Sequence, residues 1–385
     1  MNRYLQTGNL RRLSHRSLAL AALTPLVAAC GPTQVDIDPR SVVDVQVRPA
    51  SGQRLFCPGD RFQVEVVAKL EDGTTCSSTD RTRGCMGQKD AVIQASDVKI
   101  AGSEGGRGAP MEQFIWIPPA NPLTTADTGL TLKGWLQKTV GGETLKSMVG
   151  ETELRPVYSC QSAASFEEPV AGAHGPNVDI AITTLSTPYY PAAALVRVDA
   201  MGGRFYYISP SVDQAVQITS RGQAGPQGHP GQPGVNGENG KDAPIDAAPC
   251  TKGGDGTDGS NGGNGGNGGD GGNGGRIRIV IDEAAADKLR GRVLAYTLGG
   301  APGPGGPGGP GGLAGSGGSG GPTTPSCKET KGADGKPGRD GQPGLPGRPG
   351  VPGPPPEVTT MPRASLFAAE MAILTRIEAA KAKPQ

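Results

Sequence analysis

The sequence contains few of the residues on which most enzymes and nucleic-acid-binding proteins depend. Of its 385 residues three are histidines, and aromatic residues make up 4%. One histidine, His229, lies inside a glycine repeat, which argues against histidine-dependent triads and metal sites. Basic clusters with interleaved aromatic side chains are also absent, so nucleic acid is not an expected partner. We therefore predict a protein without a catalytic site, a bound metal or a cofactor.

The chain also lacks long hydrophobic segments beyond its first 29 residues. Residues 1–29 combine four arginines with an apolar stretch at 18–29 that is too short to span a bilayer stably. The stretch ends in Leu-Val-Ala-Ala-Cys-Gly at 26–31, which resembles the lipobox of bacterial lipoproteins. This resemblance implies cleavage before Cys30, lipid on its sulfur, and sorting to the outer membrane or cell surface. An ordinary secretory signal, with Cys30 incidental, is the alternative.

The remaining cysteines fit an exported protein. Besides Cys30 they are Cys57, Cys76, Cys85, Cys160, Cys250 and Cys327. An even number of cysteines in an oxidising compartment predicts three disulfides. Cys76 and Cys85 share one polar loop and are expected to pair locally, so that Cys57 and Cys160 would link an early strand to a late one. Other pairings stay open, because connectivity cannot be deduced from sequence.

Alternating apolar and polar residues predict two β units before the glycine repeats. Residues 30–40 are expected to form a tether, and about seven short strands in 41–160 predict a β-sandwich. The segment 43–73 resembles bacterial immunoglobulin-like surface domains. Residues 166–221 predict a smaller β unit that caps the repeats, because its last strand runs directly into them.

Glycine occupies every third residue in four unbroken stretches of 7, 8, 8 and 8 triplets. We call them run 1 (222–242), run 2 (253–276), run 3 (300–323) and run 4 (332–355). A strict Gly-X-Y period indicates left-handed extended helices with three residues per turn. Region 222–356 is therefore expected to consist of such helices, with a strand-containing insert at 277–299. A C-terminal helix is expected at 357–385.

The composition of the runs favours a bundle within one chain. Runs 1 and 4 carry one glycine per triplet and resemble bacterial collagen-like proteins, whereas runs 2 and 3 mostly double the glycine and resemble polyglycine II helix bundles. A second glycine adds unfolded-state entropy without benefit in a collagen triple helix, but in a lateral bundle it exposes another backbone edge for bonding. Runs 2 and 3 are therefore expected inside and runs 1 and 4 outside. A monomer is favoured, with a collagen homotrimer or a disordered region as alternatives.

The expected fold class is mainly β plus glycine-rich polyproline or polyglycine II helices and a short C-terminal α-helix. If the runs alternate in direction, Cys250 and Cys327 fall at the same end, where a disulfide can join them. These features predict a non-enzymatic cell-surface lipoprotein with a structural or adhesive role, held to the membrane by lipid. The alternatives are a module that binds a polysaccharide or an extracellular protein and, less favoured, a periplasmic enzyme.

Overall fold

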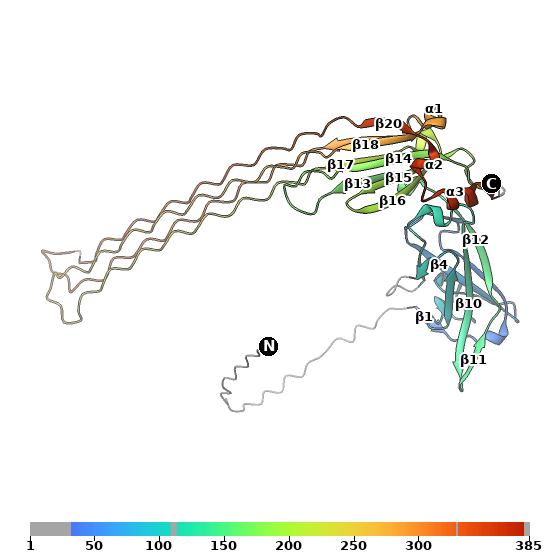
Figure 1. Ribbon diagram of the computed structural model, residues 1–385. Coiled ribbons are helices and arrows are strands. Elements are labelled where there is room, and N and C mark those ends of the chain that lie inside the picture. The colour runs from blue at the N-terminus through green and yellow to red at the C-terminus, as the bar shows by residue number, and fades with distance from the viewer. Residues whose placement is uncertain (1–31, 109–113, 329, 381–385) are drawn as a thin grey trace, which may run out of the picture.

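The computed structural model describes residues 32–108, 114–328 and 330–380, so the predicted signal sequence and Cys30 lie outside the described residues. The fold is mainly β, with 34% strand and 10% helix, as the sequence predicts. Two β units lie at one end of the molecule, and a long arm extends from the second of them (Figure 1). Within the described residues, no helix has the length and apolar character needed to cross a membrane.

The first β unit packs two sheets around one apolar core. One sheet has the order β11-β10-β12-β3 with β7 added on β10, and the other has the order β2-β4-β9-β8 with β5 added on β4. Its strands are β1 (Thr33–Val35), β2 (Val42–Pro49), β3 (Leu55–Phe56), β4 (Phe62–Leu70), β5 (Thr75–Ser77), β6 (Ala91–Ile93), β7 (Val98–Gly102), β8 (Arg107–Gly108), β9 (Ile115–Ile117), β10 (Leu130–Val140), β11 (Glu143–Lys146) and β12 (Gly150–Pro156).

The prediction of a tether at residues 30–40 is wrong from Thr33 onward. β1 pairs in parallel with β6, and the side chains of Val35 and Ile37 are buried in the core of the first unit. Burial of two aliphatic side chains contributes enough free energy to order this short segment against the sandwich. Its apolar pattern is too short to be recognised as a strand from sequence.

The second β unit consists of a three-stranded sheet and a five-stranded sheet. Their orders are β13-β17-β19 and β16-β15-β14-β18-β20. The strands are β13 (Ala163–Glu167), β14 (Val178–Leu185), β15 (Ala193–Ala200), β16 (Gly203–Ser209), β17 (Val216–Arg221), β18 (Ile277–Asp282), β19 (Val293–Leu298) and β20 (Glu357–Met361). Segments expected as a separate insert and as a C-terminal helix thus contribute strands to the sheets of this unit.

Both faces of the five-stranded sheet are buried over its central strands β15, β14 and β18. One face packs against the three-stranded sheet through residues such as Ile180 and Val196, and the other packs against the C-terminal helices through Leu195. These helices are α2 (Arg363–Leu366) and α3 (Met371–Ala379), and α1 (Ala286–Leu289) precedes β19. The helix predicted for residues 357–385 is therefore corrected to the strand β20 followed by two short helices. β20 escaped recognition because all five of its residues are exposed, which removes the alternation that marks a half-buried strand.

Each glycine run continues a strand of the second unit. β17 leads into run 1 and β19 into run 3, whereas runs 2 and 4 return into β18 and β20. β17 and β19 are parallel, as are β18 and β20, so runs 1 and 3 lead away from the sheets and runs 2 and 4 lead back. The four runs lie side by side as the arm, which we define as residues 222–355 without the insert 277–299 (Figure 1).

Candidate functional site

The four runs of the arm are joined by backbone hydrogen bonds. Among the described residues, runs 2 and 3 each bond to all three other runs, whereas runs 1 and 4 bond only to runs 2 and 3. One bond of each kind links Gly228 N to Pro304 O, Gly266 N to His229 O, Gly265 N to Gln342 O, Gly306 N to Gly266 O and Gly344 N to Gly306 O, over 2.7–2.9 Å. The runs with doubled glycines therefore occupy the inner positions, as their composition predicts.

The repeated glycine is required by the close approach of neighbouring backbones. A Cβ added to Gly262 of run 2 would lie 2.0 Å from a carbonyl oxygen of run 3, far below the 3.0 Å that real Cβ atoms respect. The second glycine of the same triplet, Gly263, has its nearest neighbour 3.1 Å away, a backbone nitrogen of run 1. Thr257 and Ser260 occupy this second position in earlier triplets. The first position therefore excludes side chains, while the second tolerates small ones from Thr257 to Gly266; nearer the sheets, at Gly272 and Gly275, it excludes them as well.

Asparagine and aspartate side chains form a ladder along the arm. Seven of them stand at the third position of successive triplets in run 2, and the Oδ1 of each accepts a hydrogen bond from a backbone N–H of run 4 over 2.6–3.0 Å. They are Asp255, Asp258, Asn261, Asn264, Asn267, Asp270 and Asn273. A backbone hydrogen bond between two runs uses only one N–H group per triplet. The ladder supplies acceptors for further backbone N–H groups of run 4, which these bonds do not use.

Two carboxylates of the arm, Asp255 of the ladder and Asp334 of run 4, have lowered pKa values. The hydrogen bond from the Ala333 amide lowers the pKa of Asp255 below its ordinary value of 3.8, and the ammonium of Lys252 adds to this effect. In run 4, the pKa of Asp334 is lowered first by a hydrogen bond from Lys331 and then by one from the backbone of run 3. These carboxylates are therefore engaged as hydrogen-bond acceptors within the arm.

The far end of the arm brings Cys250 and Cys327 together. Both are thiols in the structure, so the third disulfide expected from the sequence is not formed. The two thiols are close enough to shift each other's pKa, and Cys250 Sγ lies 3.3 Å from Thr324 Oγ1. The contact with Cys327 lowers the pKa of Cys250 and raises the pKa of Cys327. Alternation of the runs accounts for this juxtaposition, since both turns fall at the same end.

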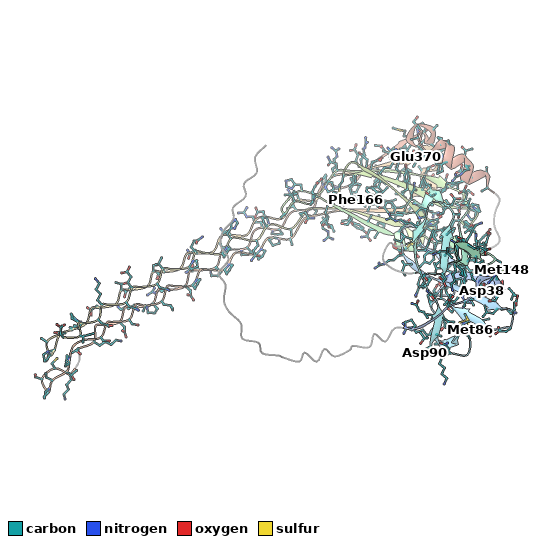
Figure 2. The ribbon with its side chains drawn as sticks, turned by 90° about the horizontal axis from the view of Figure 1, so that it is seen from below. Asp38, Met86, Asp90, Met148, Phe166 and Glu370 are labelled. Carbon is teal, nitrogen blue, oxygen red and sulfur yellow. A yellow bond between two sulfur atoms is a disulfide. The ribbon has the colours of Figure 1, made fainter. Side chains whose placement is uncertain are left out.

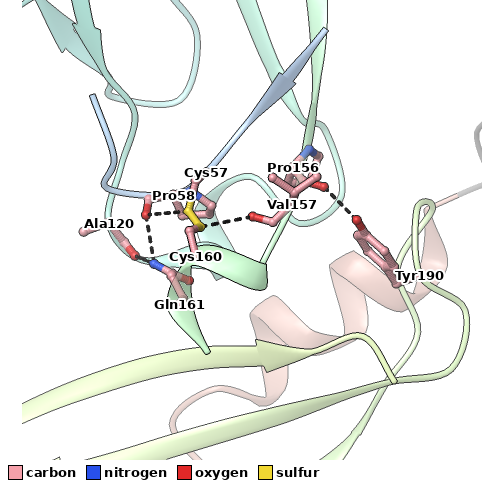
Figure 3. The surroundings of a disulfide bond; sticks show 8 residues. All are labelled: Cys57, Pro58, Ala120, Pro156, Val157, Cys160, Gln161 and Tyr190. Atoms are coloured by element: carbon pink, nitrogen blue, oxygen red, sulfur yellow. Dashed lines mark hydrogen bonds between the residues drawn. A yellow bond between two sulfur atoms is a disulfide. The ribbon is translucent and has the colours of Figure 1, made fainter. Parts of the chain in front are cut away.

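The other four cysteines form two disulfides in the first β unit. Cys57 bonds to Cys160 across a Cα–Cα distance of 6.3 Å, and Cys76 bonds to Cys85 across 4.8 Å. Beside the first bridge, Gln161 Nε2 donates to backbone oxygens at 2.9 and 3.1 Å (Figure 3). This bridge fastens the segment after β3 to the end of β12, the point at which the chain leaves the first unit.

Groups suited to catalysis or metal binding are scarce in the part of the chain that the structure describes. Cys57, Asp60 and Cys160 are the one cluster of potential metal ligands found there, and both sulfurs are consumed by the disulfide. His174 Nδ1 accepts a hydrogen bond from the backbone of run 2 at 2.9 Å, so its imidazole has a structural contact. The most regular surface of the molecule is the arm itself, from which side chains project outward along its whole length (Figure 2).

Comparison with known proteins adds no relative to this description. No family model, no curated protein and no solved structure matches the chain.

Proposed function

We propose that the arm is an intramolecular bundle of polyglycine II-type helices, and that the protein is a non-enzymatic cell-surface lipoprotein with a structural or adhesive role. The observation that carries this proposal is the lateral network of backbone hydrogen bonds between four runs of one chain. At ~3.1 Å per residue, runs of this length extend roughly 65–75 Å. A rod of that length suits a spacer or a contact arm at a surface.

The energetics of the arm support a cooperative rod. Few of its residues are large and apolar, and Val235, Leu313, Leu345 and Val351 are all exposed. Ordering about 90 backbone residues costs on the order of 100 kcal/mol, and hydrophobic burial within the arm is too small to offset it. Hydrogen bonds between the runs are the abundant compensating interaction, so the runs form or unfold together.

Ligand binding at the tip of the arm is the second candidate function. Ile245, in the loop between runs 1 and 2, is fully exposed at 108% of its reference area. An exposed aliphatic side chain at the end of a rigid arm suits recognition of a polysaccharide or an extracellular protein. Binding that is lost on Ile245→Asp while the arm stays folded would favour this function over a purely structural one.

Solution measurements on the chain from Gly31, which keeps every described residue, test the bundle. At about 1 µM, below the concentrations at which weak association populates, we expect a single-chain mass, a polyproline II circular dichroism spectrum and a cooperative melt. A three-chain mass would indicate a collagen trimer instead, and a gradual melt would indicate disorder. For the anchor, radiolabelled palmitate should enter the full-length protein and not its Cys30→Ser variant.

A further inference from the structure

The second β unit leaves two strand edges uncovered on the same side. β19 and β20 are the last strands of its two sheets, whose orders are β13-β17-β19 and β16-β15-β14-β18-β20 (Figure 1). Run 3 follows β19 and run 4 precedes β20, and the two runs bond to each other. At their base, Thr297 Oγ1 of β19 donates to Gly353 O at the end of run 4 over 3.0 Å. The two edges therefore lie next to each other, and we call them the open edges.

Backbone groups along the open edges have no partner outside their own sheets. Among the described residues, the backbone of β19 bonds only to β17 and the adjoining Gly222, and the backbone of β20 bonds only to β18. Because the N–H and C=O groups of a strand point alternately to its two sides, the groups directed away from the sheet remain available. Such an edge is a template for another strand.

The open edges lack the features by which proteins usually protect free strands. β19 and residues 358–361 of β20 contain no charged side chain and no proline. Leu294 and Tyr296 of β19 and Val358 of β20 are exposed although they are largely apolar. A lysine, a proline or a covering segment would block pairing at these positions. The open edges are therefore competent to pair.

The opposite side of the unit is protected. Its edge strands, β13 and β16, carry the charged residues Glu167 and Arg204, and both side chains form ion pairs. The first β unit also packs against this side, where its Leu123 shares an apolar cluster with Ile208 of β16. The contrast between the two sides indicates that the open edges are an interaction surface.

We propose that the open edges pair with the open edges of a second copy of this chain, each strand antiparallel to its own counterpart. A two-fold axis perpendicular to the sheets brings β19 against β19 and β20 against β20, so both sheets continue across the interface. A partner must offer two edges with the spacing of these two, and an identical chain does so by symmetry. This pairing uses both open edges of each copy, so assembly closes as a dimer.

The size of the contact predicts a weak, reversible dimer. β19 has six residues and β20 has five, so the paired edges are roughly 17–20 Å long, in two sheets about 10 Å apart. Pro356 and Pro362 flank β20 and lack the N–H groups that would lengthen its pairing. Such an interface is smaller than the ~1,200 Å² at which standard-size complexes begin. The arms leave the open edges at one end, so those of the two copies point in opposite directions. This inference goes beyond the proposed function, which concerns the arm and the anchor.

Lysine substitutions on the two sides of the unit provide a matched test. Thr359 at the centre of β20 and Ser165 at the centre of β13 are both exposed polar residues on edge strands. The chain from Gly31 carrying Cys250→Ser and Cys327→Ser, so that no intermolecular disulfide forms, is the parent. Sedimentation equilibrium compares it with Thr359→Lys and Ser165→Lys, and melting followed by circular dichroism shows whether each variant is folded.

We expect the parent to dimerise at about 10–100 µM, Thr359→Lys to weaken the dimer at least tenfold, and Ser165→Lys to leave it unchanged. The lysine at Thr359 places like charges of both copies close together in the interface. A folded parent that stays monomeric at every concentration would overturn the inference, as would equal effects of the two lysines. Both results would leave the proposed function standing, because the bundle and the anchor do not depend on the open edges.

Amide hydrogen exchange of the parent locates the interface without any substitution in the sheets. Between about 1 µM and about 100 µM, exchange should slow in residues 293–298 and 357–361 and stay constant in residues 163–167 and 203–209. Slowing confined to other segments would show that the chains associate through a different surface, and would overturn the inference.

Discussion

At the scale of single residues, the arm depends on which hydrogen atom of glycine points at a neighbouring backbone. Run 3 is the most demanding, because Cβ atoms at Gly305 and at Gly306 would lie 2.0 and 2.1 Å from carbonyl oxygens of two different runs. In the triplet of run 2 that begins at Gly262, only the first of the two glycines makes this demand. The sequence signals the difference, since Thr257 and Ser260 replace the second glycine of two triplets of run 2, and their hydroxyl oxygens accept hydrogen bonds from backbone N–H groups of run 1.

Gly262→Ala should destabilise the arm much more than Gly263→Ala. The new Cβ at Gly262 would force two hydrogen-bonded backbones apart, at an expected cost of about 2–4 kcal/mol, near the upper range of overpacking. At Gly263 a shift of a few tenths of an ångström suffices, and alanine reduces the entropy of the unfolded chain, so the net change should stay within about 1 kcal/mol. Urea unfolding followed by the polyproline II signal measures both variants, and equal losses would contradict the steric assignment.

Protonation of Asp255 in the ladder should weaken the arm in acid. The pKa of Asp255 is lowered in the folded state, so its contribution is present above the unfolded pKa near 3.8 and is lost as pH falls through the lower folded value. In Asp255→Asn an amide oxygen accepts the same hydrogen bond, as at Asn264, and this contribution no longer titrates. The melting temperature of the variant should therefore fall less between pH 5 and about pH 3. An identical fall in both proteins would show that the carboxylate does not act through its ionised form.

At the scale of elements, the C-terminal helices are held to the five-stranded sheet by one buried carboxylate. The side chain of Glu370, directly before α3, is 4% exposed. It accepts hydrogen bonds from Arg197 and Arg204 at 3.2 Å and from the Tyr206 hydroxyl at 2.7 Å. Burial, followed by the contact with Glu370, raises the pKa of Tyr206 to about 12. The hydroxyl therefore remains a donor to the carboxylate at neutral pH.

Glu370→Gln should loosen this docking. The substitution removes the charge that faces two guanidinium groups, at an expected cost of about 2–3 kcal/mol. Glu378→Gln is the matched control, because Glu378 pairs with Arg363 at the more exposed edge of α3 and should change stability by less than about 1 kcal/mol. Chemical unfolding followed by near-ultraviolet circular dichroism compares the two. A larger loss from the control would refute the role given to Glu370.

The predictability of these elements depends on how much of their stabilisation is local. The strands β14, β15 and β17 are evident in the sequence because their apolar residues face a core on at least one side. β20 and the Glu370 cluster are not, since an exposed strand lacks alternation and the partners of Glu370 lie more than 160 residues away. The inner and outer positions of the runs could be predicted from the sequence, because the number of glycines per triplet indicates how many neighbouring runs approach the backbone.

At the scale of the whole molecule, the return of the chain along the arm places two distant turns in contact. Cys250 and Cys327 are 77 positions apart in the sequence, yet their thiols lie close enough at the tip to shift each other's pKa. The same folding back places the near ends of all four runs at the second β unit, where strands anchor them. The tip is thus the one end of the arm at which the runs are joined only by loops.

Oxidation of the two tip thiols should therefore stabilise the arm without altering its fold. Treatment with oxidised glutathione should form an intramolecular disulfide, with loss of one hydrogen from each thiol to reduce the glutathione, because the two thiols already lie close together. Closing a loop of this length stabilises by about 4–5 kcal/mol on the chain-entropy model. Mass spectrometry detects the bond, and urea unfolding of oxidised protein against Cys250→Ser measures its effect. Cross-linked dimers in place of the internal bond, or an unchanged unfolding midpoint, would show that the runs do not hold the two turns together in solution.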